Sequence, residues 1–304
     1  MPHIVVVGSL NMDLVVEVPT IPLPGETVLG KNFSTFPGGK GANQAVAAAR
    51  LGAQVSLIGR VGQDAFGDQL LASARENGID VTHIGRDETA ATGVAMIAVD
   101  EQGQNSIAVA SGANFCLTAD HVRQAWAALE AVDLLVMPLE TRLETIETAV
   151  ELARESGTTV ILNPAPARSL PQKLLAGVDI LVPNEPETAQ LAGMPVGTPQ
   201  ESREAAKQLL ALGVGNVVLT LGSRGALALS GASEAFALVP AREVEVVDTT
   251  AAGDSFVAGL AVALGEGKSL VEAAQFANAV GALAVTKQGA QPGMPSREEV
   301  DALM

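Results

Sequence analysis

Two alanines and a glycine directly precede an aspartate in residues 247–256, which read VDTTAAGDSF. An apolar run follows, so Ala251, Ala252 and Gly253 are expected at the first turn of a helix. The free N–H groups of such a turn, together with the positive end of the helix dipole, attract anions. Residues with almost no side chain would leave room for a transferring phosphoryl group beside Asp254. The alternative is that Asp254 only complements the helix dipole.

A second stretch whose residues could bind a ligand is FPGGKGANQ, which runs into an alanine-rich helical pattern. Gly38, Gly39 and Gly41 would let the backbone approach a ligand closely, while Lys40 and Asn43 add hydrogen-bond donors for hydroxyl groups. An ordinary glycine-rich turn capped by Asn43 is the alternative.

Short polar side chains also follow the first apolar run, in GSLNMD. Asn11 and Asp13 could bind neighbouring hydroxyl groups, or could only stabilise a turn. This segment lacks the G-x-G-x-x-G pattern of dinucleotide-binding folds, and Lys40 lacks the spacing of a Walker A loop because Gly41 follows it. Dinucleotide binding of the Rossmann kind therefore loses its main support, and a Walker A loop is excluded.

These motifs need a scaffold, and the chain alternates apolar runs with helical patterns. The runs do not alternate with polar residues, as expected for strands covered on both faces: IVVVGS, QVSLIGRVG, LLVM, TVILNP, ILVPN and NVVLTLG. Helical patterns span residues 64–78, 118–132, 143–157 and 199–213. The sequence predicts an α/β fold, with a mostly parallel sheet and helices on both of its faces.

Two regions interrupt this alternation, residues 14–36 and 92–110. The centre of the second, DEQGQN, reads as a hairpin turn between two strands. We expect the two regions to form a small antiparallel β lid near the carboxyl ends of the strands, where ligands bind in this class of fold. A plain surface hairpin is the alternative. Because no repeat or long linker divides the chain, residues 1–304 are expected to form a single domain.

Composition limits the partners and the location. The formal net charge of -16 and the pI near 4.5 would repel nucleic acid and anionic membranes, so neither is an expected partner. The single cysteine, Cys116, excludes an intramolecular disulfide and is expected to be buried. With no leader peptide and no apolar run of membrane-spanning length, we expect a cytoplasmic location. Exposed apolar residues on the lid strands, Val94, Met96 and Ala98, could pair two lids into a homodimer.

In this order, the stretches GGKGANQAVAA, NPAPA, PNEPE, TLGSRG and DTTAAGDSF resemble the signatures of the ribokinase-like carbohydrate kinase superfamily. The similarity extends over essentially the entire chain, from GSLNMD to KQGAQP. The form GGKGANQ, together with Asn11 and Asp13, narrows the resemblance to the ribokinase family. This resemblance implies ATP-dependent phosphorylation of D-ribose at O5 to give D-ribose 5-phosphate, with Mg²⁺ as cofactor and K⁺ as activating cation.

The resemblance also implies a role for each matching residue. Asp254 would take the proton from the sugar hydroxyl, and the N–H groups around Ala251, Ala252 and Gly253 would form the anion hole. The implied sugar-binding positions are Asn11, Asp13, Gly39, Lys40, Asn43, Glu140 and Asp254. The implied nucleotide-binding positions are Asn184, Thr220, Gly222, Ser223, Gly225, Gly253 and Asn278. Glu187 would contribute to the magnesium site, and the residues implied for the monovalent cation are Asp248, Thr250, Ala284, Lys287, Gly289 and Gly293.

Two positions depart from the pattern of the superfamily. Gly293 stands where a serine often helps to hold the cation, and Pro138 stands before Leu139 and Glu140 where glutamine is common. A kinase for deoxyribose or for a nucleoside is an alternative function, although an aromatic content of 3% disfavours stacking on a nucleoside base. A sugar-sensing regulator without catalysis is the alternative from another class, and the intact Asp254 segment argues against it.

Overall fold

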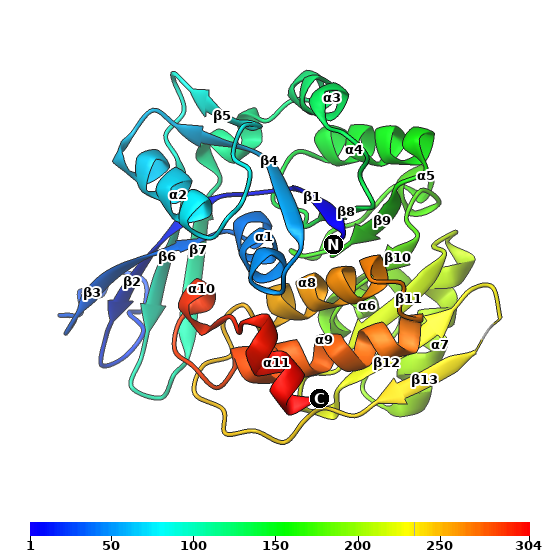
Figure 1. Cartoon of the computed structure of the whole chain (residues 1–304). Helices are drawn as coiled ribbons and strands as arrows, with labels where there is room; N and C mark the ends of the chain where they lie inside the picture. Colours follow the sequence, from blue (N-terminus) through cyan, green and yellow to red (C-terminus); the bar gives the residue numbers. More distant parts are fainter. Residues whose placement is uncertain (234) are drawn as a thin grey trace.

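The computed structural model describes residues 1–233 and 235–304, which form two β-sheets of different size (Figure 1). The large sheet has nine strands in the order β13-β12-β11-β10-β9-β8-β1-β4-β5. Its strands pair in parallel except at β11-β12 and β12-β13. The bounds are β1 (His3–Val7), β4 (Gln54–Gly62), β5 (Ile84–Asp87), β8 (Leu134–Met137), β9 (Thr159–Leu162), β10 (Ile180–Leu181), β11 (Asn216–Thr220), β12 (Ala226–Ser230) and β13 (Phe236–Val239).

Strand β1 shows why the apolar runs do not alternate with polar residues. Ile4 and Val6 pack into the hydrophobic core on one face of the sheet, whereas Val5 and Val7 pack into the core on the other face. A strand with helices on both sides has no face for polar side chains. The predicted runs lie in β1, β4, β8, β9, β10 and β11, so the mostly parallel α/β fold is confirmed.

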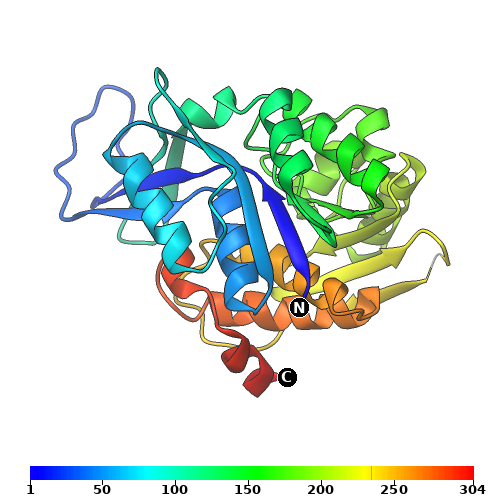
Figure 2. The same cartoon turned by 45° about the horizontal axis from the view of Figure 1, so that its top comes forward.

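Helices cover both faces of the large sheet. Apolar residues of α1, α8 and α9 share one core, and those of α3, α4 and α7 share the other. Figure 2 shows these two layers, with the green helices α3 and α4 on the face opposite the orange helices α8 and α9. The bounds are α1 (Lys40–Arg50), α2 (Ala65–Glu76), α3 (Ala119–Ala128), α4 (Leu143–Ser156), α5 (Gln172–Leu175), α6 (Glu185–Ala192), α7 (Pro199–Ala211), α8 (Ala252–Gly265), α9 (Leu270–Ala284), α10 (Ala290–Gly293) and α11 (Arg297–Leu303). The four predicted helices correspond to α2, α3, α4 and α7.

The small sheet projects from the large one and has the strand order β3-β2-β6-β7 (Figure 1). Its strands are β2 (Asn11–Glu17), β3 (Phe33–Gly38), β6 (Gly93–Val99) and β7 (Asn105–Ala110). The pairs β2-β3 and β6-β7 are antiparallel, but β2 and β6 run in parallel. The expectation of a wholly antiparallel sheet is therefore wrong, because two hairpins join side by side through strands that point the same way.

The single cysteine lies in a short helix after β7. Cys116 ends the short 3-10 helix η1 (Gly112–Cys116) and is half-buried, because Ala113 and Asn114 take the buried positions there. The expectation of a buried thiol is therefore wrong.

Among residues 1–233 and 235–304, none of the helices is long and apolar enough to cross a membrane.

Candidate active site

The carboxylate of Asp254 lies at the centre of a network of buried amide side chains. Asp254 belongs to the first turn of α8, which starts at Ala252, and its side chain is buried. Oδ2 of Asp254 accepts a hydrogen bond from Nδ2 of Asn43 at 3.0 Å, and Oδ1 accepts one from Nε2 of Gln44 at 3.1 Å. Both carboxylate oxygens are thereby fixed by donors on α1.

The N-terminus of α8 is open, in contrast to most other helices of the protein. A side chain caps α2, α3, α6, α7, α9 and α11, but no side chain caps α8. Its N-cap residue, Ala251, has a φ of 58°, the left-handed conformation that favours glycine. Gly253 is exposed, and a Cβ placed on it would meet nothing within 4 Å. The open space expected in front of Asp254 is therefore present.

The glycine-rich loop packs backbone against backbone. A Cβ on Gly41 would lie 2.5 Å from the amide nitrogen of Ser9 and 2.6 Å from Cα of Gly8. Gly39 is the N-cap of α1, with a φ of 87°. Asn43 therefore lies inside the first turn of α1, and the alternative of a turn capped by Asn43 is wrong. The close approach brings the start of α1 against Gly8 and Ser9, which follow β1.

Acidic side chains surround the ammonium group of Lys40. Oε2 of Glu140 accepts hydrogen bonds from the backbone N–H of Lys40 at 3.0 Å and from the hydroxyl of Ser9. Burial, followed by the charges of Glu140 and Asp254, raises the pKa of Asp13 to about 7, and the charge of Lys40 opposes them. The charge of Asp254 raises the pKa of Lys40 and, together with other nearby acids, outweighs the effect of burial. Lys40 is thus held charged among several carboxyl groups.

Asn11 is held by a partner that the sequence does not reveal. Nδ2 of Asn114 donates to Oδ1 of Asn11 at 2.8 Å, while Oδ1 of Asn114 accepts from the backbone N–H of Leu10 at 2.9 Å. Both asparagines are buried. A pocket of about 180 Å³ opens beside them and is also lined by Glu140 and Pro166. The predicted sugar-binding residues Asn11 and Glu140 therefore line one hollow.

The predicted nucleotide-binding residues lie on neighbouring segments, some of them exposed and some buried. Thr220 ends β11, and Gly222 and Ser223 belong to the exposed 3-10 helix η2 (Gly222–Arg224). Gly225 follows directly, with a φ of 94°. Asn278 of α9 donates from Nδ2 to the carbonyls that follow β13, at 3.0 and 3.2 Å. Gly222 and Ser223 are therefore exposed, whereas Gly225 and Asn278 are buried.

The N-x-x-E motif forms a capping box at the start of α6. Oδ1 of Asn184 accepts from the N–H of Glu187, and Oε2 of Glu187 accepts from the N–H of Asn184, both at 2.9 Å. Burial raises the pKa of Glu187, against the effects of this hydrogen bond and of the charge of Lys40. Within the described parts of the chain, no group of three or more histidine, cysteine or acidic side chains could hold a metal. Mg²⁺ commonly uses one or two carboxylates together with substrate phosphates, so Glu187 fits such a site.

The residues implied for a monovalent cation are brought together around Asp248. Its Oδ1 accepts from the N–H of Thr250 at 2.9 Å, and its Oδ2 accepts from the N–H of Gly289 at 2.8 Å. Burial raises the pKa of Asp248, but the hydrogen bonds from Thr250 and Gly289 outweigh it and lower the pKa below its usual value. The position of a Cβ on Gly293 would lie 3.1 Å from the carbonyl oxygen of Ala284 and 3.3 Å from that of Lys287. Carbonyl oxygens therefore converge where a serine side chain is missing.

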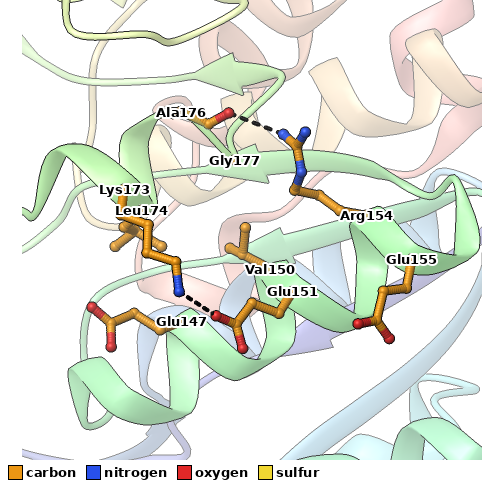
Figure 3. Close-up of a pocket in the computed structure, with 9 residues that line it drawn as sticks. All are labelled: Glu147, Val150, Glu151, Arg154, Glu155, Lys173, Leu174, Ala176 and Gly177. Atoms are coloured by element: carbon orange, nitrogen blue, oxygen red, sulfur yellow. Dashed lines mark hydrogen bonds and ion pairs between the residues drawn. The ribbon is translucent and has the colours of Figure 1, made fainter.

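A larger pocket, of about 540 Å³, lies elsewhere, between α4 and α5 (Figure 3). Its side chains are exposed for the most part and pair with one another: Nζ of Lys173 lies 2.8 Å from Oε1 of Glu151, and Nη1 of Arg154 donates to the carbonyl of Ala176 at 2.9 Å. None of the predicted site residues lines it. The larger pocket is therefore not the candidate active site.

Sequence reasoning missed the amide residues that support Asn43 and Asp254. Gln44 lies within the motif GGKGANQ, where an amide next to Asn43 is a local signal. Gln291 donates from Nε2 to Oδ1 of Asn43 at 3.3 Å, and Asn163 accepts from Nε2 of Gln44 at 3.2 Å. Nothing in the local pattern around Gln291 points to this contact.

Comparison with known proteins agrees with this fold. Residues 1–297 match the pfkB family carbohydrate kinases, and the chain belongs to this family. It is 44% identical over 295 residues to a ribokinase of Haemophilus influenzae, covering 97% of this chain and 95% of the relative. It is 38% identical over 297 residues to a deoxyribokinase of Salmonella typhimurium, covering 97% and 96% of the two chains.

A solved structure extends the comparison to three dimensions. The ribokinase of Arabidopsis thaliana complexed with ribose and ATP superposes with a TM-score of 0.90 at 35% sequence identity, over 99% of this chain and 98% of that one. The resemblance to ribokinase-like carbohydrate kinases is therefore confirmed in sequence and in fold.

Proposed function

We propose that this protein transfers the γ-phosphoryl group of ATP to O5 of D-ribose and so gives D-ribose 5-phosphate. The observation that carries the proposal is the buried carboxylate of Asp254 at the uncapped, open N-terminus of α8. Similarity along the full chain to a ribokinase, and to a structure that holds both ribose and ATP, supports the same function.

Positioning and electrostatic stabilisation account for most of the catalysis in phosphoryl transfer, because the transition state is loose. We propose that Asp254 orients the O5 hydroxyl of the sugar in line with the γ-phosphate. Asp254 would accept the proton of this hydroxyl late in the phosphoryl transfer. The free N–H groups at Ala251, Ala252 and Gly253 would stabilise the charge on the phosphoryl oxygens. Glu187 would hold Mg²⁺, which neutralises phosphate charge when it is bound. Local charges and dipoles thus allow an acidic protein to bind a polyanion.

The two substrates would bind on opposite sides of Asp254. The proposed sugar-binding residues are Asn11, Asp13, Gly39, Lys40, Asn43 and Glu140. The proposed nucleotide-binding residues are Asn184, Thr220, Gly222, Ser223, Gly225, Gly253 and Asn278. A sugar that lacks a matching hydroxyl group leaves a buried polar side chain unpaired, at a cost of about 1 to 3 kcal/mol. The sugar-binding residues would therefore set the substrate specificity.

Deoxyribose is the second candidate substrate, because a deoxyribokinase is 38% identical to this chain. The deciding experiment measures ADP release in a coupled assay with ATP and a panel of ribose, 2-deoxyribose, hexoses and nucleosides. We expect the highest kcat/KM with ribose. Faster turnover of deoxyribose or of a hexose would overturn this assignment, and no turnover with any sugar would favour a non-catalytic sugar sensor.

We further propose that K⁺ activates the enzyme through Asp248, Thr250, Ala284, Lys287, Gly289 and Gly293. The convergence of the Ala284 and Lys287 carbonyls beside Gly293 supports this, since oxygen ligands suit a hard cation. A bound cation would order the backbone that aims the N–H groups at the start of α8. In a desalted preparation, K⁺ is expected to raise kcat more than Na⁺ does. Equal activity without either ion would contradict the site.

The small sheet is proposed to act as a lid within a single domain of residues 1–304, and to pair two molecules into a homodimer. Met96 and Ile107 are 56% and 54% exposed on β6 and β7, whereas Val94 and Ala98 are half-buried. Ile107→Lys is expected to give a monomer in sedimentation, with Leu238→Lys on β13 as the matched control. A monomeric wild-type protein would contradict pairing. The cytoplasmic location stays a prediction.

A further inference from the structure

We infer that Gln44 is a positioning residue for Asp254, one that holds the carboxylate in place while the sugar binds. This inference rests on the proposed role of Asp254 as the base. Nε2 of Gln44 donates to Oδ1 of Asp254 at 3.1 Å, and the side chain of Gln44 is 1% exposed. The contact joins α1 to α8 across the interior of the protein.

Asn163, at the end of β9, determines how the amide of Gln44 is oriented. Nδ2 of Asn163 donates to the backbone carbonyl of Val182 at 2.9 Å, which turns its Oδ1 toward Gln44. That Oδ1 accepts from Nε2 of Gln44 at 3.2 Å. The two hydrogens of the Gln44 amide therefore serve Asn163 and Asp254. A flipped amide would place Oε1 against two acceptor oxygens, so only one orientation is compatible with the site.

The protein keeps this arrangement at a cost to its stability. Oε1 of Gln44 is buried and has no hydrogen-bond partner among residues 1–233 and 235–304. An unpaired buried acceptor is unfavourable, and an apolar side chain of similar size would avoid it. A purely structural role in the core therefore does not account for an amide at this position, whereas the contact with Asp254 does.

Asn43 and Gln44 hold the carboxylate in different ways. Asn43 is a proposed sugar-binding residue, so its amide would serve both the sugar and Oδ2 of Asp254. Gln44 donates to Oδ1 instead, and Asn163 anchors it from behind. Gln44 is thus the contact that holds the carboxylate independently of the sugar.

The test compares Gln44→Met, which removes the donor at similar volume, with Gln44→Glu, which replaces it with an acceptor. We expect kcat to fall on the order of 10²-fold in Gln44→Met and further in Gln44→Glu, with the KM for ATP unchanged. The acid limb of the kcat profile should move to higher pH, because a donor to a carboxylate stabilises its charged form. Exposed Gln208→Met on α7 is the matched control and should leave both quantities unchanged.

Other charged groups are coupled to the same carboxylate and stay constant in these variants: Lys40 from α1, Asp13 from β2 and Glu187 from α6, with Glu140 acting on Lys40 and Asp13. Asn163→Ala removes the acceptor that orients the Gln44 amide but leaves Gln44 itself in place. It is expected to shift the acid limb of the kcat profile in the same direction as Gln44→Met, by a smaller amount. This variant serves as the second test if Gln44→Met does not fold.

The outcomes separate this inference from the proposed function. An inactive Asp254→Asn variant, together with an unchanged pH profile in the Gln44 and Asn163 variants, would overturn the role of Gln44 alone. Full activity of Asp254→Asn would instead remove the proposed base and the inference with it.

Discussion

The two sides of the candidate site are built differently. On the proposed sugar side, Asn11 and Asn43 are buried and hydrogen-bonded, and a Cβ on Gly41 would clash with backbone at 2.5 Å. On the proposed nucleotide side, Gly222 and Gly253 are exposed, and a Cβ on either would meet nothing within 4 Å. The side that must distinguish hydroxyl groups is fixed before the ligand arrives, whereas the side that receives a large anion is left open.

The largest expected effect concerns Asp254, where the two sides meet. Asp254→Asn keeps the shape of the side chain but removes the proton acceptor, so kcat should fall on the order of 10² to 10⁴. Steady-state kinetics and a thermal melt on this one variant decide its role. If Asp254 only complemented the helix dipole, the variant would lose about 0.3 to 1 kcal/mol of stability and keep its turnover.

Asp13→Asn tests whether the sugar side trades stability for binding. Because the pKa of folded Asp13, about 7, lies above its usual value of 3.8, the folded protein binds this proton more tightly than the unfolded chain does. The ionised carboxylate therefore destabilises the fold, and the protein loses stability as the pH rises from about 4 to about 7. The variant should melt at a higher temperature than the wild type at pH 8.

The same substitution should impair sugar binding without affecting the nucleotide side. Loss of a charged acceptor for a hydroxyl group costs about 1 to 3 kcal/mol, which corresponds to a rise in the KM for ribose of roughly 5-fold to 150-fold. The KM for ATP should stay within twofold. In the wild type, the KM for ribose should rise as the pH falls below about 7. Equal changes in both KM values would contradict the separation of the two sides.

A pair of glycine-to-alanine variants tests the difference in packing. Gly41→Ala should destabilise the fold by about 1 to 3 kcal/mol, since its methyl group would meet the backbone of Ser9. Gly253→Ala should keep or raise the melting temperature, because alanine favours a helix over glycine by about 1 kcal/mol. Its methyl group would nevertheless enter the space proposed for the phosphoryl group and lower kcat. Similar melting temperatures for the two variants would remove the contrast.

The smallest expected effect is at Ala251. Its left-handed backbone, with a φ of 58°, costs about 1 kcal/mol in a residue that has a Cβ. Ala251→Gly relieves this strain in the folded protein, but it also raises the conformational entropy of the unfolded chain. The two effects oppose each other, so the net change in stability should stay below about 1 kcal/mol. Turnover should change by less than threefold. A large loss of kcat would show that the strained conformation itself aims the N–H groups.

Local patterns predict much of this structure, and long-range contacts account for what they miss. Apolar runs and helical periodicity locate strands such as β1 and helices such as α2, because burial on two faces or on one stripe leaves a signal along the chain. The parallel pairing of β2 with β6 leaves no such signal, since it depends on how two hairpins meet. The antiparallel strands β12 and β13, at one end of the large sheet, leave no recognised signal either.

The candidate site shows the same division. The small residues before Asp254 and the glycine-rich loop are local, so their positions could be predicted from spacing. The contact of Gln44 with Asp254 joins residues 210 positions apart, and that of Asn114 with Asn11 joins residues 103 apart. Periodicity carries no information at such separations, and only the fold brings these amides to the site.

The contact between Gly8 and Gly41 limits how this family member can change its substrate. A side chain on either residue would meet the backbone of the other segment within 2.6 Å. A single substitution at either position forces the backbone to shift and costs stability, so the path of the backbone around the proposed sugar site resists change. New specificity is therefore expected to arise through side chains that line the pocket, such as Asn11 and Glu140, rather than through the backbone that carries them.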